Sequence, residues 1–151
     1  MSDRLPAQVA RLTVITLGVS DMRASIAFYD ALGFARKFRA TGEEVAFFET
    51  GGAVLGHYPW SKLALDAALP DQPRPTGFRG TTLAWNCCTT DEVDAVLAFA
   101  VASGAALLKA AHPTDYGGYS GYFADPDGHP WEVVVAPGIE VGEDRRVHLP
   151  D

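Results

Sequence analysis

The same order of elements occurs twice in this 151-residue chain, and this repeat limits the possible folds more than any other feature. Each half begins with a strand rich in β-branched residues, continues with a capped helix that ends at a glycine, and closes with three short strands. The expected elements are 11–19, 22–32, 35–39, 44–50 and 53–58 in the first half, and 81–88, 90–103, 105–110, 119–124 and 131–136 in the second. Each half therefore predicts a βαβββ module, although the residues of the two halves barely match.

Both helices carry start and stop signals. Asp21 is a candidate N-cap for the first helix, and Gly33 stands where a helix C-cap favours left-handed geometry. Thr89 and Glu92 have the spacing of a capping box before the second helix, which ends at Gly104. The two helices therefore have nearly equal expected lengths. The last two strands of the first half are expected to meet at a two-glycine turn, Gly51-Gly52.

The sequence divides into an N-terminal extension (1–10), a first module (11–58), a linker (59–80), a second module (81–137) and a C-terminal tail (138–151). The linker is rich in proline, and its first part, 60–69, is compatible with a short helix. The tail is polar and is either a mobile end or an arm on a partner subunit. The expected fold class is α+β, with two βαβββ modules.

Composition excludes several classes of function. Apolar residues make up 48% and charged residues 21%, as in ordinary globular domains, and the formal charge is −7 without a basic cluster. We therefore expect neither nucleic acid nor membrane as a partner. No stretch is long and apolar enough to span a bilayer, and the first residues lack a signal-peptide core, so a cytoplasmic protein is expected. Cys87 and Cys88 are adjacent and lack the spacing of a zinc or redox motif, which indicates reduced structural thiols.

A β-hairpin near the C-terminus places one carboxylate just beyond a tight turn. In Asp125-Pro126-Asp127-Gly128, proline fixes one backbone angle and Gly128 allows the positive φ that reverses the chain. Glu132 follows in the next strand.

This hairpin, together with Val19-Ser20-Asp21, Ser25-Ile26-Ala27-Phe28-Tyr29 and Leu32-Gly33-Phe34, resembles the vicinal oxygen chelate superfamily over residues 11–137. The superfamily contains glyoxalases, extradiol dioxygenases, fosfomycin-resistance enzymes and bleomycin-resistance proteins. The resemblance implies two βαβββ modules that form curved mixed sheets around a shared cavity, with the modules supplied by one chain or by two, and it favours a homodimer.

The resemblance also implies four metal-ligand positions, which fall on Val14, Gly56, Thr81 and Glu132. Only Glu132 is a plausible ligand, whereas a catalytic divalent site needs about three protein ligands. No metal cofactor is therefore expected. The alternative is Zn, Ni, Mn or Fe held by Glu132 and His57, the latter turned inward by a strand bulge. His112, His129 and His148 are expected to be structural or solvated.

Strand alternation predicts an aromatic pocket. With Thr81 inward, Leu83 and Trp85 also face inward, and with Gly56 inward, Tyr58 does too. The expected ligand-binding residues are Val14, Thr16, Tyr58, Thr81, Leu83, Trp85 and Tyr116. The expected catalytic residues are Glu132 and Tyr122, the latter because the resemblance places it where fosfomycin-resistance enzymes have a substrate-contacting tyrosine. The aromatic residues could instead fill the core, and Glu132 could instead pair with a buried polar group.

Three functions are compatible with these observations. The preferred hypothesis is a protein that binds a small aromatic or planar molecule without a catalytic metal, as the resemblance to bleomycin-resistance proteins implies. The second is a metal-dependent glyoxalase-like lyase or isomerase, or a ring-cleaving dioxygenase. The third is a structural or regulatory dimer with a vestigial pocket.

Overall fold

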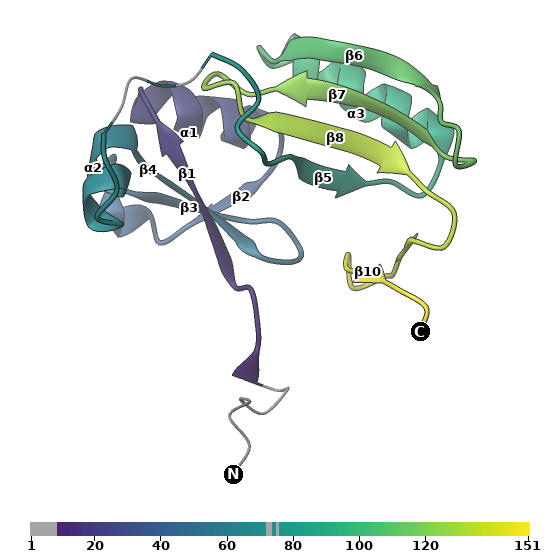
Figure 1. Ribbon diagram of the computed structural model, residues 1–151, viewed down its shortest axis with the longest axis horizontal. Coiled ribbons are helices and arrows are strands. Elements are labelled where there is room, and N and C mark those ends of the chain that lie inside the picture. Colours follow the sequence, from purple (N-terminus) through teal and green to yellow (C-terminus); the bar gives the residue numbers. More distant parts are fainter. Residues whose placement is uncertain (1–8, 72–73, 75) are drawn as a thin grey trace.

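The computed structural model describes residues 9–71, 74 and 76–151 of the chain. It contains two four-stranded mixed sheets, each accompanied by a helix, as Figure 1 shows. The first module comprises β1 (Val14–Val19), α1 (Met22–Ala31), β2 (Ala35–Lys37), β3 (Ala46–Glu49) and β4 (Val54–Pro59). The second comprises β5 (Leu83–Asn86), α3 (Thr90–Ala102), β6 (Ala106–Pro113), β7 (Tyr119–Ala124) and β8 (Pro130–Val135). The predicted α+β fold with two βαβββ modules is confirmed.

The two sheets have matching topology. The strand orders are β1-β4-β3-β2 and β5-β8-β7-β6, and in each sheet the first strand of the module pairs in parallel with the last. The helices begin at the predicted caps, because the Asp21 carboxylate accepts from the Ala24 amide at 3.0 Å and the Thr89 hydroxyl from the Glu92 amide at 3.1 Å. The repeated capping signals therefore place equivalent helices beside equivalent sheets.

The structure also contains a short helix in the linker, which the sequence anticipated, and three features that it did not. The linker holds α2 (Trp60–Asp66), and the tail forms a small ladder of β9 (Glu140–Val141) and β10 (Val147–His148). A 3-10 helix, η2 (Arg39–Thr41), follows β2. The connection at Gly51-Gly52 is longer than the predicted two-residue turn, because β3 ends at Glu49 and β4 begins at Val54. Only Gly51 has a positive φ, and the Thr50 hydroxyl donates to the Ala53 carbonyl across the loop. No helix among the described residues could cross a membrane.

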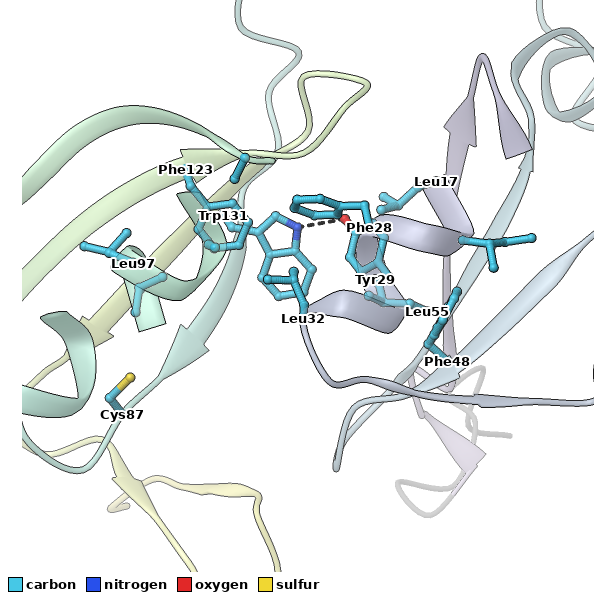
Figure 2. Close-up of a cluster of buried hydrophobic side chains, with 14 of the residues drawn as sticks. Leu17, Phe28, Tyr29, Leu32, Phe48, Leu55, Cys87, Leu97, Phe123 and Trp131 are labelled. Atoms are coloured by element: carbon cyan, nitrogen blue, oxygen red, sulfur yellow. Dashed lines mark hydrogen bonds between the residues drawn. The ribbon is translucent and has the colours of Figure 1, made fainter. Parts of the chain in front are cut away.

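The two modules share one hydrophobic core between α1 and β8. Tyr29 and Phe28 of α1 lie against Trp131 and Phe123 of the second sheet, as Figure 2 shows. Phe123 and Trp131 stack with their ring centroids 5.9 Å apart, and Tyr29 lies 6.1 Å from Trp131. The modules are therefore joined through the helix-covered faces of their sheets.

A buried chain of hydrogen bonds crosses this core. Trp131 Nε1 donates to Tyr29 Oη at 3.0 Å, and Tyr29 Oη donates to Asp125 Oδ2 at 2.8 Å. Asp125 Oδ1 accepts from the amides of Asp127 and His129 at 2.9 Å each. Burial raises the pKa of both Tyr29 and Asp125. The Asp125 carboxylate of the hairpin turn is thus hydrogen-bonded to Tyr29 of the first module.

His57 lies in the same core and does not reach the opposite face of the sheet. Its strand partners, Leu17 and Ala46, are in regular register, so no bulge turns it. Its Nδ1 lies 2.8 Å from the Ser25 hydroxyl of α1, and its side chain is 0% exposed. Nε2 has no hydrogen-bond partner among the described residues. Burial, with a smaller effect of His129, lowers the pKa of His57 from 6.5 to about 4.

The Tyr29 hydroxyl tests whether the buried chain holds the modules together. Tyr29→Phe leaves the Trp131 indole and one Asp125 oxygen without their partner, so we expect a loss of about 1–3 kcal/mol in the free energy of unfolding. Urea denaturation measures this loss. Tyr119→Phe is the matched control, because its hydroxyl bonds Asp94 at an exposed site, and a change within about 0.5 kcal/mol is expected. Equal losses in the two variants would contradict the proposed role.

The low pKa of His57 makes stability depend on pH. Between pH 6.5 and about 4 the unfolded chain binds a proton at His57 that the folded chain does not, so stability falls as pH falls through this window. The expected contribution is about 3 kcal/mol. Urea denaturation from pH 7 to 4 should give a smaller slope for Ser25→Ala/His57→Phe, which removes both hydrogen-bonding partners, than for the wild type. An imidazole NMR titration with a midpoint near 6.5 for His57 would overturn this expectation.

Candidate functional site

Tyr122 and Glu132 form a hydrogen-bonded pair in the second sheet. They are direct cross-strand partners in β7 and β8, and Tyr122 Oη donates to Glu132 Oε2 at 2.5 Å. This hydrogen bond, with a smaller effect of desolvation, raises the pKa of Tyr122 to about 12. The phenol therefore keeps its proton at neutral pH and can orient the carboxylate. The structure brings the two predicted catalytic residues together.

Trp85 does not share a face with this pair. In the parallel register of β5 and β8, Ala84 lies beside Glu132 and Trp85 lies beside Val133. Because alternate strand residues point to opposite faces, Trp85 and Leu83 lie on the core side of the sheet and Glu132 on the other. The expectation of one pocket containing both Trp85 and Glu132 is wrong. The sequence shows which residues of β5 share a face with Thr81. It does not show which residues of β8 lie beside them.

Trp85 and Leu83 instead line a cavity of about 480 Å³ between the modules, which we call the inter-module cavity. Ile15 and Leu55 contribute to it from the first module, and Trp131 from the second. The rings of Phe34 and Trp85 lie 5.2 Å apart, centroid to centroid. Polar groups also line it, namely Asn86, Glu92, Arg145 and Arg146. Both modules thus share a cavity with an aromatic wall and polar side chains, but it is not the cavity predicted around Gly56, Thr81 and Glu132.

The remaining predicted ligand-binding residues are dispersed. Val14, Thr16 and Tyr58 share the face of the first sheet opposite His57, as the pairs Thr16–Gly56 and Gly18–Tyr58 show. Thr16 and Thr81 line a second cavity, beneath α2. Tyr116 is 55% exposed in the turn between β6 and β7, and it makes a small contribution to the raised pKa of Tyr122. These residues therefore do not form one site with Glu132 within the chain.

The donor set of a single chain does not fit a catalytic divalent metal. His57 points into the core toward Ser25, whereas the Glu132 carboxylate is bound by Tyr122 in the other module. Over the described part of the chain, no cluster of three or more His, Cys, Asp or Glu side chains could hold an ion. A catalytic zinc-type site normally has three protein ligands and one open position. The pairing of Glu132 with His57 as metal ligands is therefore not supported by their positions.

Sequence reasoning missed Phe34 and the arginines of the tail. Phe34 follows Gly33, whose φ of 93° turns the chain at the end of α1 so that the Phe34 ring returns to Trp85. A glycine C-cap followed by an aromatic residue could have signalled this contact. The position of Arg145 depends on the tail folding back, because its side chain lies against Gly51 of the β3–β4 loop. No local pattern predicts that contact.

Comparison with known proteins agrees with the fold. The Glyoxalase/Bleomycin resistance protein/Dioxygenase superfamily profile matches residues 11–133. A glyoxalase-related enzyme from Fulvimarina pelagi is 35% identical with a TM-score of 0.82, covering 93% of this chain and 99% of its own. A glyoxalase/bleomycin resistance protein/dioxygenase family enzyme from Burkholderia phytofirmans PsJN is 23% identical with a TM-score of 0.75, covering 84% and 99%.

Lactoylglutathione lyase from Agrobacterium tumefaciens is 23% identical with a TM-score of 0.62, covering 87% of this chain and 96% of its own. No curated protein matches the chain. The family profile spans most of both modules, and the Fulvimarina enzyme is similar over nearly the whole sequence. The chain belongs to the Glyoxalase/Bleomycin resistance protein/Dioxygenase superfamily.

Proposed function

We propose that this protein binds a small planar or aromatic molecule in the inter-module cavity without using a catalytic metal. The observation that carries the proposal is the aromatic wall of Phe34 and Trp85, whose ring centroids are 5.2 Å apart beside a cavity of about 480 Å³. This volume lies within the range of small-molecule pockets, about 300–1,000 Å³. A flat ligand would gain both apolar burial and ring stacking there.

The polar residues of this cavity would orient such a ligand. Arg145 and Arg146 come from the tail, and Asn86 and Glu92 come from the end of β5 and the first turn of α3. A few polar groups around an apolar wall are typical of sites that select one orientation of a small molecule. The tail would therefore form part of the binding site. We also keep the proposal that the protein is located in the cytoplasm.

A second candidate function is a glyoxalase-like lyase or isomerase, or a dioxygenase, and the Tyr122–Glu132 pair favours it. A carboxylate held at 2.5 Å by a protonated phenol is positioned to accept a proton from a substrate. Chemistry that needs a metal would require further ligands from a partner chain. The third candidate, a dimer with a vestigial pocket, predicts no ligand at either place.

We further propose a homodimer, because apolar side chains lie exposed on an edge strand of each sheet. Leu107 and Leu108 of the edge strand β6 are 52% and 56% exposed, and Val14 of β1 is 42% exposed. Edge strands with apolar side chains favour pairing or cover by another chain. A two-fold contact would cover the same patch in both copies.

Light scattering tests the dimer. At micromolar concentration the mass should be about twice the 16.1 kDa of one chain. Leu108→Lys should shift the protein toward the monomer, because a charge on the edge strand opposes pairing. Leu65→Lys on α2, a residue that is 80% exposed, is the matched control and should leave the mass unchanged. A wild-type monomer persisting at high concentration would contradict the proposal.

Ligand-induced stabilisation tests the cavity. An aromatic compound at 100 times its Kd should add about 2.7 kcal/mol to the free energy of unfolding, because only the folded chain offers the site. Trp85→Ala should reduce this gain by weakening the binding, whereas Phe99→Ala, at a 52% exposed position on α3, should not. Thermal denaturation with a panel of aromatic compounds measures both effects.

The effect of metal ions on thermal stability tests whether the proposed function is independent of a metal. Zn²⁺, Ni²⁺ and Mn²⁺ should change the melting temperature little in the wild type. A metal-dependent rise that disappears in Glu132→Gln would instead support the enzyme hypothesis, with Glu132 as a ligand. Indifference both to metals and to the whole aromatic panel would favour the vestigial pocket.

A further inference from the structure

We propose that the cavity beneath α2 is a second binding site, which takes an apolar molecule carrying one anionic head group, with Arg79 holding the head. This α2 cavity has a volume of about 720 Å³ and lies between β1, α2, the segment before β5, and the start of β8. Its apolar walls include Trp60, Leu63, Ala67, Leu69, Leu83 and Pro130. It shares Ile15 and Leu83 with the inter-module cavity, but neither Trp85 nor the Tyr122–Glu132 pair lines it.

The helix α2 presents apolar side chains to this cavity instead of packing them into the core. Leu63, Ala64 and Ala67 all line the cavity, and their spacing places them on one side of the helix. Not one residue of α2 is buried. When a ligand fills a cavity of this size, the apolar side chains of the covering helix lose contact with water, which favours binding.

Arg79 is held at the cavity wall by neutral acceptors. Its Nη2 donates to the Asp127 carbonyl at 2.5 Å, and its Nη1 lies 3.3 Å from His129 Nδ1. His129 Nε2 lies 2.8 Å from the Gly18 carbonyl, which requires this nitrogen to carry the proton and leaves Nδ1 as an acceptor. Gly128 makes room for the guanidinium, because a Cβ there would lie 2.9 Å from Nη2. The hairpin turn thus fixes the position of the charge.

The charge of Arg79 is not neutralised by a side chain. No described carboxylate forms an ion pair with it, whereas the neighbouring Arg74 pairs with Asp127. The Arg79 guanidinium lies over the ring of Trp60, which is also part of the cavity wall, with the guanidinium carbon 5.2 Å from the ring centroid. Two neutral acceptors use two of the five N–H donors of an arginine, so donors remain for a ligand.

The charge pattern of the cavity selects an anion. Its lining contains Arg79 and His129 but neither aspartate nor glutamate, although the chain has a formal charge of −7. A guanidinium binds a carboxylate through two parallel hydrogen bonds, and the apolar walls exclude the competing water. An apolar monocarboxylic acid therefore matches the cavity at both ends, whereas a neutral or cationic amphiphile matches only its walls.

Calorimetric titration of the full chain with decanoate, decanol and decylamine tests the site. Decanoate should bind at least about 10-fold more tightly than decanol, and decylamine should bind most weakly. Arg79→Gln should remove the advantage of decanoate and leave decanol binding unchanged. The matched control is Arg23→Gln, which removes an exposed arginine paired with Glu43 and should leave all three affinities unchanged.

A second variant separates loss of the site from loss of the fold. Ala67→Trp fills the α2 cavity away from the hairpin turn and should abolish binding of decanoate and decanol, while stabilisation by an aromatic ligand at Trp85 is retained. Unchanged decanoate binding in either Arg79→Gln or Ala67→Trp would overturn the proposal. So would decanoate binding that weakens as the chain dimerises, since a second copy would then occupy the cavity.

Discussion

The hydroxyl of Tyr29 sits where the two modules meet, accepting from the Trp131 indole and donating to the Asp125 carboxylate. A buried carboxylate is costly unless its oxygens are satisfied, and Asp125 satisfies the second oxygen with the amides of its own turn. Asp127 of the same turn accepts from the amide and hydroxyl of Ser20. The turn that shapes the last hairpin therefore also fixes where the first module begins its helix, and the cavities between the modules depend on that placement.

Sequence patterns predicted the elements well because their signals are local. The caps at Asp21 and Thr89 and the positive φ at Gly128 each involve residues within about four positions. The register of β5 against β8 is not local, because it joins segments about fifty residues apart. One residue of register decides whether Trp85 or Ala84 lies beside Glu132. A tight hairpin connects the strands of Tyr122 and Glu132, so a sequence can indicate that these two residues are adjacent, whereas it cannot indicate the partners of Trp85.

The difference between local signals and strand register also explains why His57 is not placed as a metal ligand. Its neighbour Gly56 occupies the position that the family resemblance assigns to a ligand, so only a bulge could have brought the imidazole to that face. The regular pairing of β4 with both β1 and β3 leaves no residue to form one. A core of Tyr29 and Phe48 around the ring, with its Nδ1 against Ser25, instead favours the neutral imidazole. The histidine adds a pH-dependent element to the core and offers no ligand to the outer face.

The modules are joined through their helix-covered faces, and this arrangement separates the two candidate sites. The aromatic cavity lies along the seam between the modules, whereas the Tyr122–Glu132 pair lies on the opposite face of the second sheet. Neither Tyr122 nor Glu132 lines the cavity beside Trp85, so the two candidate sites have no side chain in common. In the proposed homodimer, another copy of the chain would cover the exposed apolar residues of β1 and β6 and could exclude water from the face that carries Glu132. The proposed binding at Trp85 needs no such partner, so each candidate function can be tested without the other.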